Sequence, residues 1–187
     1  MACVFLGGPA MAHPHHSMSN PGGFVPGFAH PWLGLDHLLA MVAVGVLAVR
    51  IGGRALWGVP VTFLAFLVVG GVIGLEGFET RLIEAGIALS VILLGVALAS
   101  GKKYPLGVTL VGVAAMALFH GHFHGAELPA MAAPGTYAVG LLVATAQLHL
   151  LGVAAGMYMT GSVKRTAALR FSGAVIAIAG AVFLFQA

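Results

Sequence analysis

Six long apolar stretches, separated by short polar breaks, dominate the chain. Their approximate ranges are 31–49, 55–75, 82–100, 105–124, 136–159 and 167–186. Each is close to the roughly 20 apolar residues that an α-helix needs to cross a bilayer. The breaks are too short to hold a soluble domain, and connections of this length make consecutive helices antiparallel neighbours. The pattern therefore predicts an all-α membrane protein with six transmembrane helices.

The residues before the first stretch are of two kinds. Residues 1–12 combine a short apolar segment with the pattern Ala10-Met11-Ala12, which is typical of signal-peptide cleavage. We expect a cleaved signal peptide there, and because no basic segment precedes it, its true start is left open. Residues 13–29 are rich in His, Pro, Gly and Ser, a composition that favours turns and extended chain. We expect an external tail there, followed by the transmembrane domain at 30–187.

The basic residues fall on one side of this predicted topology. Seven of the eight Lys and Arg residues lie in the connections between spans one and two, three and four, and five and six. They are Arg50, Arg54, Lys102, Lys103, Lys164, Arg165 and Arg170. Under the positive-inside rule these connections are cytoplasmic, so both mature termini face outside. We therefore expect a bacterial inner-membrane protein with a periplasmic N-terminus, whose basic charge needs no nucleic-acid partner.

Composition agrees with a membrane protein and points to its chemistry. Of the 187 residues 60% are hydrophobic and 7% charged, whereas a soluble domain is about 25% charged. The mean hydropathy of +1.05 also excludes a disordered chain. The single cysteine, Cys3, argues against thiolate metal sites and cysteine nucleophiles. Nine histidines outnumber five acidic residues, so imidazole is the commonest acid–base group.

The first span begins with three ionisable side chains. His30 precedes Pro31, so we expect it at the helix cap, with Asp36 and His37 about 10 Å further along the helix. His30 and His37 are seven residues apart and should share one helix face. Ionisable groups inside a bilayer are costly and usually functional. These side chains are therefore candidate metal ligands.

The fourth span ends in a second polar motif. His120 and His124 are spaced i, i+4, so both imidazoles project from one face, and Glu127 continues that face. This arrangement is a suitable chelate for a divalent metal ion. Gly121 and Gly125 leave room for another backbone to approach closely.

The remaining histidines form a second group of candidates. His122 points away from the face of its neighbours, and His149 lies about halfway along the fifth span or slightly deeper. For His149 a role in metal transfer and a hydrogen bond to a carbonyl both remain open. His13, His15 and His16 lie in the predicted tail, where they could gather a metal loosely. Imidazole with carboxylate suits Ni²⁺, Co²⁺, Zn²⁺ or Cu²⁺ better than Mg²⁺ or Ca²⁺.

The two motifs resemble those of the HupE/UreJ family of nickel permeases and accessory proteins. That family carries a His-x5-Asp-His motif, matched here by His30, Asp36 and His37. It also carries an F-H-G-x-A-H-G-x-E motif, matched by residues 119–127, with Phe123 in place of the usual alanine. The resemblance implies transport of Ni²⁺, with Co²⁺ as another substrate, for enzymes such as hydrogenase or urease. It implies neither a permanently bound cofactor nor an enzymatic activity.

The resulting hypothesis is a nickel permease, in which the tail and the outer rim capture the ion and His149 is an inner handover point. We expect the metal site to combine His30, Asp36, His37, His120, His124 and Glu127. The metal ion and the bilayer are the expected partners, with a second copy of the chain and nickel-enzyme maturation proteins as further candidates. Three alternatives stay open: an intramembrane zinc-dependent hydrolase, a b-type haem protein, and a nickel-binding accessory or sensing protein that does not transport.

Overall fold

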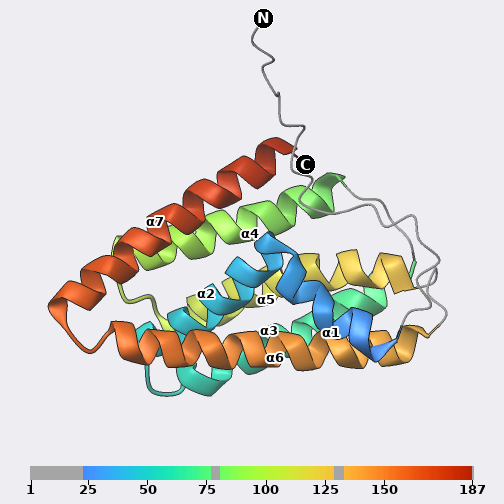
Figure 1. Ribbon diagram of the computed structural model, residues 1–187, viewed down its shortest axis with the longest axis horizontal. Helices are drawn as coiled ribbons and strands as arrows, with labels where there is room; N and C mark the ends of the chain where they lie inside the picture. The colour runs from blue at the N-terminus through green and yellow to red at the C-terminus, as the bar shows by residue number, and fades with distance from the viewer. Residues whose placement is uncertain (1–22, 77–80, 129–132, 187) are drawn as a thin grey trace, which may run out of the picture.

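The computed structural model describes residues 23–76, 81–128 and 133–186. These residues form seven α-helices (Figure 1). The helices are α1 Phe24–Leu33, α2 Leu35–Ile51, α3 Ala55–Gly74, α4 Arg81–Ser100, α5 Leu106–Glu127, α6 Pro134–Met159 and α7 Val163–Gln186. The leader expected at 1–12 and the tail histidines His13, His15 and His16 lie outside the described residues.

The helices have the lengths and surfaces expected of a membrane protein. Five of them, α3 to α7, are each long and apolar enough to cross a membrane, and α1 with α2 makes a sixth if the bent pair is one span. Large apolar side chains such as Val61, Val111 and Ile178 are exposed on the outside of the bundle. Several ionisable side chains are buried inside it. An all-helical membrane protein with five to six spans is therefore confirmed.

The first span differs from its prediction. The sequence predicts one helix over 31–49 with His30 as its cap, whereas α1 ends at Leu33, α2 begins at Leu35, and the two helices meet at an angle of 81°. Gly34 between them has an extended backbone, with φ −80° and ψ 111°. Pro31 lacks the N–H that the last turn of α1 would use, which weakens the helix just before the break. His30 consequently lies inside α1 and not at a cap.

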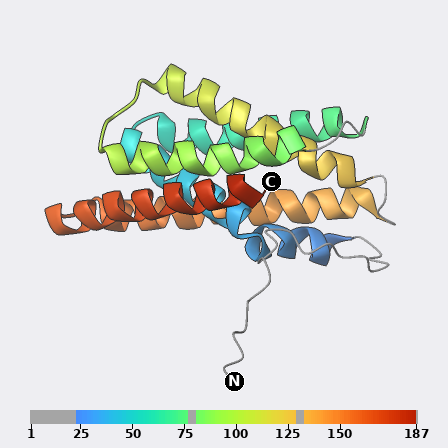
Figure 2. The same ribbon diagram turned by 90° about the horizontal axis from the view of Figure 1, so that it is seen from above.

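Helix α1 also reaches into the segment expected to be an extended tail. Residues 24–29 are helical, and Pro26 falls in the first turn, where a missing N–H is tolerated. Helix α1 lies along α6 (Figure 2). A Cβ added at Gly140 of α6 would overlap the carbonyl oxygen of Phe24. This close contact stabilises a helix over residues 24–29, although the composition of that segment favours turns.

The most extensive helix contacts join helices that are not consecutive in the chain. Helix α3 packs on α5, α4 on α7, and both α1 and α2 on α6. The prediction that consecutive helices are neighbours holds in part, because α2 also contacts α3 and α4 contacts α5. The helices approach most closely where both carry glycine. Gly45 of α2 lies directly against the backbone of Gly152 of α6. The close approach predicted for Gly121 and Gly125 is confirmed, since both lie against main-chain oxygens of α3.

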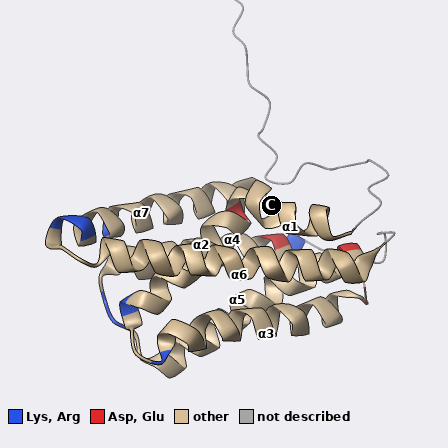
Figure 3. Cartoon of the chain, turned by 60° about the horizontal axis from the view of Figure 1, so that its bottom comes forward, with Lys and Arg blue, Asp and Glu red and all other residues tan. Residues whose placement is uncertain are grey.

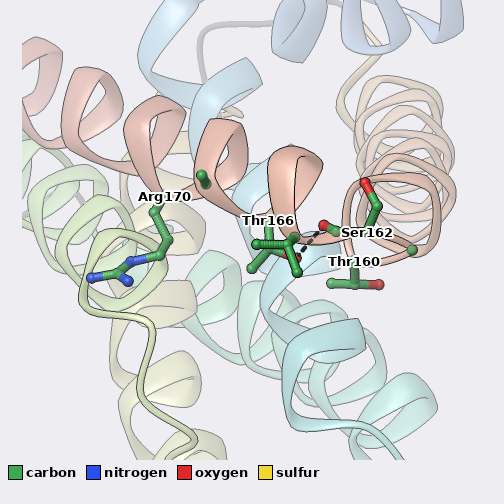
Figure 4. Close-up of a pocket in the computed structure, with 7 residues that line it drawn as sticks. Thr160, Ser162, Thr166 and Arg170 are labelled. Atoms are coloured by element: carbon green, nitrogen blue, oxygen red, sulfur yellow. Dashed lines mark hydrogen bonds between the residues drawn. The ribbon is translucent and has the colours of Figure 1, made fainter.

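The described basic residues lie at one end of the bundle, around the α2–α3, α4–α5 and α6–α7 connections, apart from Arg81 at the start of α4 (Figure 3). Two of them bind carbonyl oxygens in the last turn of α4. The Arg50 guanidinium donates to the Leu98 carbonyl, and the Arg170 Nε donates to the Ala99 carbonyl over 3.0 Å. Arg170 also lines an open hollow with Thr160, Ser162 and Thr166 (Figure 4). No histidine lines this hollow, so it is separate from the polar cluster described below.

Replacing Gly45 by alanine should lower the thermal midpoint of the protein purified in detergent. The new methyl group would overlap the carbonyl oxygen of His149, and overpacking of this kind costs about 1–3 kcal/mol. Gly112→Ala is the matched control, since nothing lies within 4 Å of a Cβ at that position. Equal midpoints for the two variants would contradict the packing described here.

Candidate metal site

Three imidazoles converge at the end of the bundle opposite the basic connections. They belong to His30 of α1, His37 of α2 and His124 of α5, and we call them the imidazole cluster. One nitrogen atom from each lies within 4.8 Å of the other two. The ring centroids of His30 and His124 are 4.8 Å apart, and those of His37 and His124 are 4.9 Å apart. His37 and His124 are buried, whereas His30 is half-buried.

The break between α1 and α2 makes this convergence. In a continuous helix, residues seven apart are displaced by about 10 Å along the axis. The rings of His30 and His37 are instead 5.4 Å apart, edge to face, because α1 folds back at Gly34. The sequence pattern thus predicted that His30 and His37 lie together. The bend at Gly34, and not a shared helix face, brings them together.

Asp36 orients the His37 ring. Its Oδ1 accepts a hydrogen bond from the His37 backbone N–H over 2.8 Å and lies 2.9 Å from His37 Nδ1. An ionised carboxylate only accepts hydrogen bonds, so Nδ1 carries the proton and the ring lone pair is on Nε2. A carboxylate behind a metal-binding imidazole in this way raises its basicity and fixes its tautomer. Asp36 is 3% exposed, so its charge also lies inside the bundle.

Gly34 provides the space for this pair. A Cβ at this position would lie 3.1 Å from Asp36 Oδ1 and 3.3 Å from His37 Nδ1, closer than ordinary van der Waals contact. The backbone angles of Gly34 are accessible to any residue, so the side-chain space and not the conformation favours glycine here.

Helix α5 contributes His124 and, at its last residue, Glu127. His124 Nδ1 lies 3.8 Å from Glu127 Oε2, which is longer than a hydrogen bond but close enough for electrostatic attraction to a positive charge. The Glu127 side chain is 40% exposed. Glu127 therefore lies at the mouth of the imidazole cluster, with part of its side chain exposed and Oε2 buried next to His124.

His120 extends the polar side chains inward. Its ring is 5.1 Å from that of His37, and its Nε2 lies 2.9 Å from Ser90 Oγ of α4. The Ser90 hydroxyl donates its proton to the carbonyl of Ile87 over 2.6 Å. It must therefore accept from His120 Nε2–H, which leaves the His120 lone pair on Nδ1. His120 is completely buried and lies beyond the three nitrogen atoms that come closest together.

The other two candidates on described helices lie outside the imidazole cluster. His122 is half-buried, and its main-chain carbonyl lies against Gly74 of α3. His149 is buried on α6, next to the ring of Phe63, at 5.1 Å between centroids. Phe63 also contacts the ring of His120, at 5.7 Å between centroids, so one apolar ring contacts both histidines.

Sequence reasoning missed three residues at this site. Ser90 and Phe63 contact His120 from α4 and α3, and Tyr137 of α6 has its ring 6.3 Å from that of His30. Tyr137 is buried, and its hydroxyl has no hydrogen-bond partner among the described residues. A serine in an apolar span or a tyrosine in a first helical turn is a weak signal alone. Their importance follows only from which helices pack together.

The imidazole cluster is suited to a divalent transition-metal ion. Nitrogen ligands about 2.1 Å from a tetrahedral ion lie about 3.4 Å from one another, so nitrogens within 4.8 Å would need to close by at most about 1.4 Å, a shift within reach of side-chain rotation. Neutral imidazole favours nickel, cobalt, zinc and copper over the oxygen-seeking magnesium and calcium. The buried Asp36 carboxylate would offset part of the cost of removing a dication from water.

Comparison with known proteins gives one family. The family described as HupE / UreJ protein matches residues 1–183. A relative from Rhizobium leguminosarum bv. viciae named Protein HupE is 43% identical over 176 residues, which cover 94% of this chain and 91% of that protein. No solved structure matches.

Substituting Asp36 by asparagine should weaken nickel binding about 10–100-fold, the range typical for loss of a carboxylate behind a metal-bound imidazole. The side-chain volume is retained, so the variant should still fold. Isothermal titration of detergent-purified protein measures the affinity, and Glu76→Gln, an exposed acid at the end of α3, is the charge-matched control. An unchanged affinity for Asp36→Asn would show that the pair does not serve metal binding.

Replacing Tyr137 by phenylalanine should affect the thermal stability of the protein and its affinity for nickel differently. Removal of a buried hydroxyl without a partner leaves the thermal midpoint of the metal-free protein unchanged or raises it. Nickel affinity should nevertheless fall several-fold, because the Tyr137 ring lies beside His30 and we expect its hydroxyl to hydrogen-bond a water bound to the ion. A midpoint that falls while affinity is retained would assign Tyr137 to packing alone.

Proposed function

The chain belongs to the HupE/UreJ family, whose members are metal permeases and accessory proteins and not enzymes, and from this premise we propose that it imports Ni²⁺ across the bacterial inner membrane. The observation that carries the proposal is the convergence of His30, His37 and His124 inside a bundle of membrane-length helices. Ionisable side chains at such depth mark ion pathways in membrane proteins.

The ion first meets the exposed side of the imidazole cluster. Glu127 is partly exposed and attracts the hydrated dication, and half-buried His30 can exchange a water ligand for an imidazole. His37 and His124 then complete a three-nitrogen site from the buried side. Asp36 does not bind the ion itself. Its Oδ1 accepts a hydrogen bond from His37 Nδ1, and its negative charge stabilises the cation. His120 is the next imidazole inward from His37.

Family membership decides between this function and the enzymatic alternative. Three imidazoles and a bound water also occur at the metal of zinc hydrolases, so the imidazole cluster by itself fits either chemistry. Membership of a permease and accessory family removes the hydrolase. Membership of the same family also argues against a b-type haem, since the family is linked to metal-ion transport and not to a bound cofactor.

The orientation that we propose places the imidazole cluster on the periplasmic side. The basic connections lie at the opposite end of the bundle and would be cytoplasmic under the positive-inside rule (Figure 3). Residues 1–12 would be a signal peptide and 13–29 would lie outside, apart from the part that α1 includes. His13, His15 and His16 could then gather the ion near the mouth of the site.

The substrate that we propose is Ni²⁺, with Co²⁺ as a competitor, because the same nitrogen ligands bind both ions. The ion is cargo, and no permanently bound cofactor is needed. Delivery to maturation proteins of a nickel enzyme such as hydrogenase or urease, and assembly of several copies, belong to the same proposal.

Uptake of radioactive nickel tests the site. Cells expressing His37→Ala or His124→Ala should accumulate nickel only at background level, since each substitution removes one of three converging nitrogens. Thr109→Val, a near-isosteric change at the other end of α5, should leave uptake intact. Normal accumulation by both histidine variants, at equal amounts of protein in the membrane, would refute the site.

Purified protein in liposomes separates transport from an accessory role. The wild-type protein should admit Ni²⁺ to a trapped fluorescent indicator, with Co²⁺ competing more strongly than Mg²⁺ or Ca²⁺. Saturable nickel binding without any flux would contradict the permease and favour an accessory protein.

A further inference from the structure

His149 is a buried imidazole whose polarity nothing in its surroundings explains. It is 1% exposed, and neither Nδ1 nor Nε2 has a hydrogen-bond partner among the described residues. Buried polar groups are nearly always hydrogen-bonded, because leaving one without a partner is costly. A leucine or phenylalanine would fill the same space without this cost. An imidazole at this position therefore points to a ligand that binds there.

The position of His149 relates it to the imidazole cluster. Its carbonyl oxygen lies against Gly45, which follows His37 by eight residues on α2 and so lies about 12 Å deeper. Helical side chains tilt toward the N-terminus of their helix. Because the first turn of α6 lies next to His30, the His149 ring leans toward the imidazole cluster.

Phe63 contacts both His149 and the histidine before it. This phenylalanine is completely buried, with its ring 5.7 Å from the His120 ring and 5.1 Å from the His149 ring. From the mouth of the site inward, Glu127 and the imidazole cluster are followed by His120 and then by His149. The Phe63 ring is an apolar surface that both imidazoles contact.

We propose that His149 is a second, transient binding site for the divalent cation, and that the ion passes to it from His120 along the Phe63 ring, which contacts both imidazoles. The proposal rests on the permease function given above. It assigns the ion a path beyond the imidazole cluster, toward the basic end of the bundle.

The surroundings of His149 suit a site that releases its ion. Asp36 strengthens His37 as a ligand, whereas His149 has no hydrogen-bonded carboxylate or carbonyl among the described residues. A ring without such support is the weaker base and the weaker ligand. Conduction requires sites that bind an ion well enough to take it up and weakly enough to let it leave. A strong outer site followed by a weak inner one meets both requirements.

Flux and binding of the variants, measured on the same preparations, test the proposal. His149→Leu should bind Ni²⁺ at the imidazole cluster within about twofold of wild type, while its initial nickel flux into liposomes falls at least tenfold. Leu148→Met, a buried neighbour on α6, is the control for core perturbation and should keep both properties. Wild-type flux in His149→Leu would overturn the inner site and leave the permease standing, whereas absence of flux in the wild type would overturn the permease itself.

A ligand replacement distinguishes metal binding from packing. His149→Cys should recover part of the flux lost in His149→Leu and shift preference toward Zn²⁺ and Cd²⁺, because a thiolate is the softer ligand. Flux no higher in the cysteine variant than in the leucine variant would assign His149 to packing and overturn the proposal.

Cobalt spectroscopy decides the question even if His149→Leu does not fold. Titration of wild-type protein with Co²⁺ should give two successive absorbance changes, the second at higher concentration. His149→Gln, which keeps a polar side chain, should lose only the second change. A single change that is identical in both proteins would refute a second site.

Discussion

The buried pair of Asp36 and His37 is the constraint from which the arrangement of the polar cluster follows. A carboxylate enclosed by apolar helices is tolerated only when hydrogen bonds or an opposite charge compensate for lost hydration. Here the backbone N–H and the ring of His37 both meet one Asp36 oxygen. That geometry occupies the space beside Gly34, where the chain turns by 81° between α1 and α2. The same turn places His30 opposite His37, so the turn that accommodates the buried carboxylate also brings two candidate metal ligands together.

Close packing between glycines holds the rest of the cluster in position. Lipid supplies no hydrophobic force between helices, so tight contact between backbones stabilises a membrane bundle. Gly121 and Gly125 bring α5 against α3, and Gly45 and Gly152 bring α2 against α6. Because α3 also packs on α2, these contacts together set the level of His120 and His124 relative to His37. Helix α4 then adds Ser90, whose hydroxyl determines the His120 tautomer.

The histidines differ in how deeply they are buried and in whether a carboxylate lies next to them. Both properties change in order from the mouth of the site inward. Glu127 and His30 are partly exposed, His37 and His124 are buried with carboxylates nearby, and His149 is buried without a hydrogen-bonded partner among the described residues. An ion moving inward would lose water first and negative charge afterwards. On the proposed path, the candidate ligands with carboxylate support would therefore lie where dehydration is most costly, and His149, which lacks it, would lie where the ion is released.

The sequence by itself determined the class of the protein and most members of its site. Apolar stretches of membrane length, basic residues confined to alternate connections, and ionisable residues inside apolar spans are all visible without coordinates, because each departs from what a bilayer tolerates. Only the tertiary structure decided the break at Gly34, the helix over residues 24–29, and the pairing of α3 with α5 and α4 with α7. It also placed Ser90, Tyr137 and Phe63 beside the histidines. The reason is that these features depend on which backbones approach closely, and close approach joins residues far apart in the chain that carry no local signal of one another.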